Sequence, residues 1–355
     1  MSVVLFDRHI RAALFPFTET RHTADIRVGI FTIREKWERL LKAPVKIGES
    51  DEVQPGEVAV PANVLPTQED YLQIIETYKT GSELSSEIRT INRPWDIFIH
   101  NAWAIKSDAY IIANEKKSAA ISSTNKYTNE RAIFLEEGVT MEHCIINADE
   151  GAVYIGRNAL VMEGTMIRGP VSIGESAVVK MGAKLYAGTT VGPHCVAGGE
   201  IKNSVLMEYS NKAHDGYLGD SVIGAWCNIG AGTSNSNMKN NAGDVSYLFD
   251  EDESPMIAGN KAGLLMGDYS RCAINTSFNT GTIVGVGCNI FDRSFPLKLT
   301  PNFSWGDTKY LLEKALNDIS KWKALKGQKL TEEETEILKQ LYYKSFDNEK
   351  TNSGS

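Results

Sequence analysis

The chain has 355 residues, a formal net charge of −8 and a pI near 5.4, with 42% hydrophobic and 23% charged residues. These values are typical of a globular protein with two or three structural units. The acidic balance argues against nucleic acid and anionic membranes as partners. Charged residues interrupt the apolar start of the chain at Asp7 and Arg8, which indicates neither a signal peptide nor a spanning helix. We therefore expect a cytoplasmic protein.

The first part of the chain, residues 1–105, combines strand-like and helix-like patterns. A short apolar strand is predicted over 3–6, and helical periodicity marks the segments 32–41 and 71–79. A connector then carries a further helical pattern over 97–104. The sequence therefore predicts a small α/β region followed by a connector.

A six-residue period dominates the middle of the chain. Aliphatic residues recur six apart at Ile155, Val161, Ile167, Ile173, Val179, Leu185, Val191 and Ala197. A second set of small residues shares the period, at Ala159, Thr165, Val171, Ala177, Ala183, Thr189 and Cys195. Hexads of this kind form short strands and tight turns that stack into a solenoid with a continuous apolar core. The fold class is therefore mainly β, with a left-handed parallel β-helix over 106–296.

The same period occurs in other phases on both sides of this run. An earlier phase is predicted at Ile133, Val139 and Ile145, and a later one at Met266, Cys272, Phe278, Val284 and Ile290. The acidic segment 250–253 lies in the irregular stretch before the later phase and is predicted to be an excursion loop at a subunit edge. The five cysteines lack CxxC spacing, which indicates buried free thiols.

The last part, residues 297–355, carries helical periodicity over 307–325 and 330–343. Thr331 and Glu334 have the spacing of a capping box. We expect these helices to form a hairpin that closes the open end of the β-helix, because an exposed terminal coil invites edge pairing.

One segment carries a specific resemblance. The stretch YLGDSVIGAWCNIGAGTSNSN, Tyr217 to Asn237, and the upstream GGEIKNS and NKAHDG resemble bifunctional N-acetylglucosamine-1-phosphate uridyltransferase/glucosamine-1-phosphate acetyltransferases and related sugar nucleotidyltransferases that carry a β-helix. The resemblance covers about residues 130 to 295. It implies acetyl transfer to an amino sugar phosphate or sugar nucleotide.

The resemblance also implies a set of site residues. His214 matches the family's general base, which removes a proton from the attacking amine. Asn237 matches a residue near that amine. The resemblance further implies a sugar-phosphate pocket of Glu200, Lys202, Tyr217 and Asn228, with Lys184 as a nearby cation, and an acetyl-CoA groove at Ala231 and Thr233. No zinc, nicotinamide or flavin motif is present, and no metal site is predicted.

The sequence departs from the family pattern at several positions. Tyr186 stands where the phosphate-binding segment carries an arginine, and Met238 replaces a tyrosine. The N-terminal region resembles the start of sugar nucleotidyltransferases only faintly, since no glycine precedes Gly29 and the phosphate-binding glycine loop is missing. Arg8, Arg11 and Arg21 could bind an anion there, but the favoured interpretation is that they are solvated surface arginines.

Three functions follow from these patterns. The first is an acetyl-CoA-dependent acyltransferase, which the resemblance implies to be a homotrimer with its site at a subunit interface. The second is a sugar-1-phosphate nucleotidyltransferase, for which Mg²⁺ would be required. The third is a trimeric scaffold or ligand-binding protein without catalysis, which the changes at Tyr186 and Met238 allow.

Overall fold

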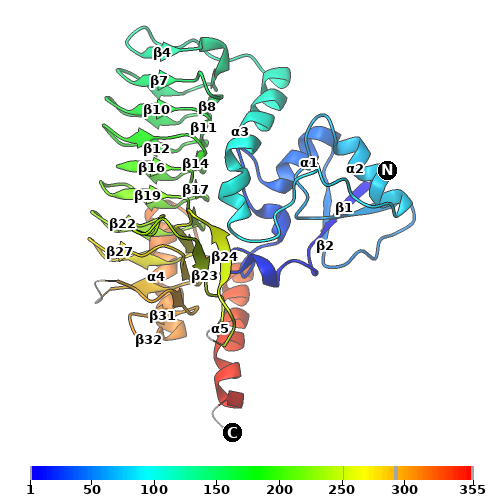
Figure 1. Ribbon diagram of the computed structural model, residues 1–355, viewed down its shortest axis with the longest axis vertical. Coiled ribbons are helices and arrows are strands. Elements are labelled where there is room, and N and C mark those ends of the chain that lie inside the picture. Colours follow the sequence, from blue (N-terminus) through cyan, green and yellow to red (C-terminus); the bar gives the residue numbers. More distant parts are fainter. Residues whose placement is uncertain (1, 251, 292–294, 353–355) are drawn as a thin grey trace.

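The computed structural model describes residues 2–250, 252–291 and 295–352. It consists of a tall β-solenoid, an N-terminal α/β region against one side of it, and two C-terminal helices (Figure 1). No helix among the described residues is both long and apolar enough to cross a lipid bilayer.

The N-terminal region is built on a three-stranded parallel sheet. Strands β1 (Ser2–Phe6), β2 (Lys46–Gly48) and β3 (Glu57–Pro61) lie in the order β2-β1-β3. Helix α1 (Ile33–Leu41) begins with a complete capping box between Thr32 and Glu35, and α2 (Tyr71–Thr80) ends at Gly81 in the left-handed conformation. Short 3₁₀ turns occupy Ala12–Leu14 and Thr23–Asp25. The predicted α/β region is confirmed.

Helix α3 (Asp96–Glu115) joins this region to the solenoid and is much longer than the predicted segment 97–104. The amide of Asn101 donates to the carbonyl of Gly188 at 2.7 Å and accepts from the backbone N–H of Gly29 at 2.6 Å. A β-carbon on Gly29 would lie 2.4 Å from the carboxylate of Asp108, so only glycine fits there. The helix therefore fastens the N-terminal region to the coils.

The solenoid has three faces, and each face is a sheet of mainly parallel strands. The first sheet contains β4 (Lys126–Thr128), β7 (Ile145–Asn147), β10 (Met166–Arg168), β13 (Lys184–Leu185), β16 (Glu200–Lys202) and β19 (Tyr217–Gly219). The second contains β5 (Ile133–Leu135), β8 (Val153–Ile155), β11 (Val171–Ile173), β14 (Thr189–Val191), β17 (Val205–Leu206), β20 (Val222–Ile223), β25 (Leu264–Met266), β28 (Thr282–Val284) and β30 (Leu299–Thr300). A 3₁₀ turn at Glu130–Ala132 precedes β5.

The third sheet completes each coil. It contains β6 (Thr140–Met141), β9 (Leu160–Val161), β12 (Val178–Val179), β15 (Val196–Ala197), β18 (Asn211–Lys212), β21 (Asn228–Ile229), β26 (Arg271–Cys272), β29 (Asn289–Ile290), β31 (Ser304–Trp305) and β32 (Thr308–Lys309). All its pairings are parallel except the final hairpin of β31 with β32.

The hexad residues form the core of this solenoid. Both predicted sets of the main run and the later set from Met266 to Ile290 are buried, and all of these residues except Thr165 and Thr189 belong to one continuous apolar cluster. The five cysteines are buried free thiols, as predicted. One earlier position is wrong: Ile145 is 50% exposed and its neighbour Ile146 points inward, because side chains alternate along β7. The parallel β-helix is confirmed, and its left-handed sense stays a prediction.

An excursion interrupts the coils between β21 and β25. Strands β22 (Ser234–Asn235) and β27 (Ser277–Phe278) pair in parallel, and β23 (Val245–Tyr247) pairs antiparallel with β24 (Met256–Gly259). The predicted acidic loop 250–253 lies between β23 and β24, and its residue 251 lies outside the described part. Its place at a subunit edge stays a prediction.

Two helices, α4 (Leu312–Leu325) and α5 (Glu332–Asn352), follow the last coil. Helix α4 starts later than the predicted residue 307, because residues 304–309 form the β31–β32 hairpin. The capping box of Thr331 and Glu334 is confirmed. The predicted position across the open end is wrong: Trp322 and Lys326 contact Arg271 and Asn211, so α4 lies along the third sheet (Figure 1).

The predicted ranges 1–105, 106–296 and 297–355 stay predictions as domains. Helix α3 continues through residue 105, and strands of the solenoid sheets continue past residue 296.

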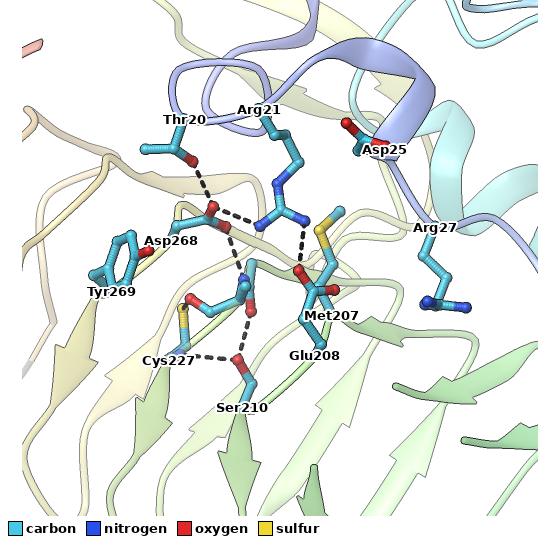
Figure 2. A network of polar contacts seen from close by, with 12 residues as sticks. Thr20, Arg21, Asp25, Arg27, Met207, Glu208, Ser210, Cys227, Asp268 and Tyr269 are labelled. Atoms are coloured by element: carbon cyan, nitrogen blue, oxygen red, sulfur yellow. Dashed lines mark hydrogen bonds and ion pairs between the residues drawn. The ribbon is translucent and has the colours of Figure 1, made fainter. Parts of the chain in front are cut away.

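Figure 2 shows a second junction between the N-terminal region and the solenoid. The guanidinium of Arg21 donates to Glu208 at 3.0 Å and to Asp268 at 2.5 Å, and the hydroxyl of Thr20 donates to the same oxygen of Asp268. Glu208 and Asp268 belong to different coils. Both terminal nitrogens of Arg21 are therefore held in an internal ion-pair network, so Arg21 is not the solvated surface residue that the sequence favoured.

Candidate functional site

Three of the candidate residues lie in one row on the outer face of the first sheet. The strand register places Lys184 beside Glu200 and Glu200 beside Tyr217. In each strand the middle residue turns into the core, so the flanking side chains face outward. Lys202 lies in the neighbouring row, opposite Gly219. The structure therefore brings a lysine, a carboxylate and a phenol together, with a second lysine close by.

The side chain of Tyr217 lies across its own strand. A β-carbon on Gly219 would come 2.2 Å from the phenol oxygen, so the ring occupies the space that a side chain at 219 would need. The amide of Asn237 donates to the phenol oxygen at 3.1 Å. Burial, helped by the carboxylates of Asp220 and Glu200, raises the pKa of Tyr217 to about 12. The phenol therefore keeps its proton at neutral pH and can donate it to a ligand.

Asp220 organises this cluster and was missed as a site residue, although it belongs to the YLGD motif. Its buried carboxylate accepts from the amide of Asn203 at 2.7 Å and from the amide of Asn237. Because one oxygen holds Asn237, the orientation of that amide toward Tyr217 is fixed. The signal available in the sequence was a carboxylate directly after a strand, where a left-handed backbone (φ +47°) favours Asp or Asn.

Substituting Gly219→Ala is expected to displace the ring of Tyr217, since the added methyl group overlaps the phenol. Once displaced toward solvent, the phenol should titrate near the ordinary tyrosine pKa of about 10. Ultraviolet titration of the native protein and of Gly219→Ala checks this, and Tyr217→Phe identifies the signal. An unchanged titration of the Tyr217 phenol in Gly219→Ala would contradict the packing described.

The remaining candidates line a groove on the other side of the corner formed by residues 213–216. This groove, of about 520 Å³, is lined by Ala213, His214, Asn228 and Ala231 from the solenoid and by Trp322, Leu325 and Lys326 from the end of α4. The imidazole of His214 is exposed at its edge. Asn228 lies on the third sheet next to Asn211, and thus not on the face that carries Glu200 and Lys202.

The loop that carries His214 is held by a buried lysine. Lys212 is only 2% exposed, and its ammonium donates to the carbonyl of Gly198 at 3.2 Å and to the carbonyl of His214. Burial lowers the pKa of Lys212 to about 8, while the nearby Asp215 partly offsets this shift. The ammonium therefore ties the backbone of His214 to the preceding coil.

A Lys212→Met variant is expected to change the pH dependence of stability. Between about pH 8 and 10.5 the folded lysine is neutral while the unfolded lysine is still charged, so the unfolded chain binds more protons. The native protein should therefore gain stability over the variant as pH rises through this window, by on the order of 1 kcal/mol per pH unit. Urea unfolding of both proteins across this range measures the difference. Lys184→Met, at an exposed lysine, is the control. If the stability difference between the native protein and Lys212→Met changes with pH no more than the difference for this control, the account is contradicted.

Thr233 does not contribute its side chain to the groove. Its hydroxyl donates to the carbonyl of Ala273 at 3.2 Å inside the coil. Only the backbone at this position can face a ligand. Tyr186 and Met238, the two departures from the family pattern, are both exposed side chains.

No group of three or more metal-binding side chains occurs within the residues that the structure describes. A larger hollow of about 1060 Å³ lies between the N-terminal region, the excursion hairpin and α5. It is lined by Arg8, Arg11 and Arg93 near the carboxyl end of β1. Arg11 pairs with Asp7 at 3.1 Å, whereas Arg8 is exposed.

Comparisons with known proteins relate the chain to sugar nucleotidyl transferases and to GlmU proteins. Residues 3–84 match the family described as sugar nucleotidyl transferase. The chain is 25% identical over 235 residues to the bifunctional protein GlmU of Methanococcus vannielii, covering 63% of this chain and 49% of that protein. It is 34% identical over 117 residues to GlmU of Bordetella parapertussis, covering 30% of this chain and 26% of that protein. The chain thus spans about half, or less, of the curated relatives it matches.

A solved structure, PerB from Caulobacter crescentus in complex with CoA and GDP-perosamine, is 14% identical and covers 84% of this chain and 93% of that chain. Its TM-score of 0.19 is too low to support an argument about this protein. The sequence matches confirm the resemblance that the motifs predicted: the chain is similar to GlmU proteins.

Proposed function

We propose that the protein transfers an acyl group from acetyl-CoA to an amino sugar phosphate or a sugar nucleotide, with His214 as general base. The observation that carries this proposal is the arrangement around the corner 213–216. An exposed imidazole stands at the edge of a groove on one side, and Lys184, Glu200, Lys202 and Tyr217 lie on the sheet that begins on the other side. A general base between two ligand surfaces is what acyl transfer between two substrates requires.

In this proposal the acceptor would bind on the first sheet. The lysines suit a phosphate group, and the phenol of Tyr217 and the amides around Asp220 suit sugar hydroxyls. An amine attacks a thioester only as the free base, so His214 would take its proton while Asn237 holds the amine. The groove beside Ala231 would hold the acyl donor, with Trp322 and Leu325 as an apolar wall for its arm.

A second copy of the chain completes the site in this proposal. Helix α3 covers the second sheet and α4 covers the third, whereas the first sheet exposes Ile145, Met166 and Tyr186. Ile145 and Met166 are register neighbours, and exposed apolar side chains that gather on one sheet are typical of an association surface. A homotrimer around this face would bring a neighbouring chain against Glu200 and Tyr217, and light scattering at micromolar concentration measures that state.

Donor binding tests the proposal without a known acceptor. Calorimetry should show acetyl-CoA binding to the native protein and a loss of at least about tenfold for Ala231→Trp, whose side chain would fill the groove. His143→Asn serves as a control, because His143 is an exposed residue of an upper coil with a left-handed backbone that Asn tolerates. Absence of binding to the native protein would contradict the acyltransferase proposal.

Sugar-1-phosphate nucleotidyl transfer is the second candidate. The family match over residues 3–84 and the hollow lined by Arg8, Arg11 and Arg93 favour it. The three-stranded sheet and the absence of glycine before Gly29 disfavour it. Pyrophosphate release from nucleoside triphosphates with Mg²⁺ and a sugar 1-phosphate, without acetyl-CoA, would identify this activity.

A further inference from the structure

The third sheet holds a buried arginine that lacks a carboxylate partner. Arg271 lies in β26, in an outward row with Asn228 above it and Asn289 below it. The next residue of the strand, Cys272, points into the core. Arg271 therefore faces away from the core, and α4 covers it. The ring of Trp322 lies 5.1 Å from the guanidinium carbon, and Arg271 is 7% exposed. The charge is therefore held between the sheet and the helix.

Two of its nitrogens have no acceptor. Among the described residues, neither Nε nor Nη2 of Arg271 makes a hydrogen bond, and no salt bridge reaches the guanidinium. Arg21 provides a direct comparison, because its two terminal nitrogens are paired with Glu208 and Asp268. Burial lowers the pKa of Arg271, although Tyr310 and Asp318 nearby oppose this shift. A buried cation with two nitrogens that lack an acceptor is costly, which makes the site favourable for an anion.

A small cavity adjoins this side chain. It measures about 100 Å³ and is lined by Arg271, Asn289, Tyr310, Asp318, Lys321 and Trp322. Since a water molecule occupies about 30 Å³ in the liquid, the space suits a group of a few heavy atoms. Lys321 also lines the cavity, and its side chain is largely exposed to solvent. The cavity thus joins a buried cation to a solvent-accessible one.

The charge of the lining is net positive. Asp318 is its one acidic member, and it accepts from the hydroxyl of Tyr310 at 2.7 Å and lies 3.6 Å from the ammonium of Lys321. Two cations and one carboxylate leave a net charge of +1. Arginine pairs well with tetrahedral oxyanions because its planar donors match two oxygens at once.

We propose that Arg271 and Lys321 form a binding site for a small oxyanion of the phosphate class. Trp322 lines both this cavity and the larger groove that contains His214. The oxyanion therefore has two sources: free inorganic phosphate, or a phosphate group of a longer ligand that lies in the groove. The second source rests on the proposed acyl donor, and the first does not.

Calorimetry and thermal unfolding with inorganic phosphate, at constant ionic strength maintained with sodium chloride, test the site in the full chain. Phosphate should bind the native protein and raise its Tm, while chloride should not. Arg271→Met should weaken phosphate binding roughly 10- to 100-fold. Lys321→Glu changes only the exposed mouth, so it keeps the test valid if the buried variant folds poorly, and it should weaken binding about tenfold. Lys180→Ala, an exposed lysine outside the cavity, should bind as the native protein does.

Competition distinguishes the two sources. If acetyl-CoA displaces phosphate and an acetyl-CoA lacking its 3′-phosphate does not, the site belongs to the donor. If neither displaces it, the site takes the free ion. Equal phosphate binding by the native protein and Lys321→Glu, or no phosphate binding at millimolar concentration, would overturn the proposal while leaving acyl transfer untouched.

Discussion

The His214→Gln variant should transfer acetyl groups about 10²- to 10⁴-fold more slowly than the native protein. Glutamine fills a similar volume and can form hydrogen bonds, but it cannot accept a proton from an ammonium group. The acceptor amine would then have to reach the thioester already deprotonated, and only a small fraction is in that form at neutral pH. The loss should therefore appear in kcat rather than in the KM for acetyl-CoA.

Two features of the structure make this a clean test. His214 is exposed, and its loop is held through backbone contacts with Lys212, so the substitution should leave the fold intact. His143→Asn removes a different exposed histidine and should keep the native rate. Steady-state release of CoA thiol measures both variants, and a His214→Gln rate within twofold of the native rate would exclude His214 as the base.

Arg21→Met should lower the free energy of unfolding by about 3–5 kcal/mol. The variant removes the only guanidinium that bridges Glu208 and Asp268 among the described residues, and it leaves both carboxylates without this cation (Figure 2). The N-terminal region would also lose a contact that spans two coils. Urea unfolding measures the loss, and Arg8→Met, which removes an exposed arginine of the same charge, should change stability by less than about 0.5 kcal/mol.

The pH dependence separates this ion pair from general packing effects. Burial tends to raise the pKa of Glu208, but the charges of Arg21 and Arg27 hold it below the ordinary value of 4.5. The stabilisation is therefore present above pH 4.5 and is lost as the pH falls through the folded-state pKa. Without Arg21 this depression should disappear. Adding Glu208→Gln to Arg21→Met should restore part of the stability, and a strictly additive double variant would contradict the pairing.

The fold was predictable where physical constraints act over short distances. The hexad period placed the core residues from Ile155 to Ala197 correctly, because every coil must present the same side chains to the same axis. The capping box at Thr331 was likewise predicted from local sequence. Ile145 was misplaced because Ile145 and Ile146 are equally apolar, and the strand register alone decides which one points inward.

The site was predictable only as a set of residues, not as an arrangement. Its neighbours come from different coils, as when Asp220 holds both Asn203 and Asn237, and such contacts depend on coil length rather than on local pattern. The sequence also did not predict that α4 forms one wall of the groove, because helical periodicity does not determine where a helix packs. For the same reason the ion pairs of Arg21 with Glu208 and Asp268 were not predicted.

The measurement that tests the central claim most directly is acceptor-dependent release of thiol from acetyl-CoA by the native protein. The acceptors are amino sugars, their 1-phosphates and their nucleotides. Acyl transfer predicts release with at least one phosphate-bearing amino sugar and an acetylated product in equal amount. Thiol release that no acceptor increases, from a protein that is folded and assembled, would contradict the assignment of this site to acyl transfer.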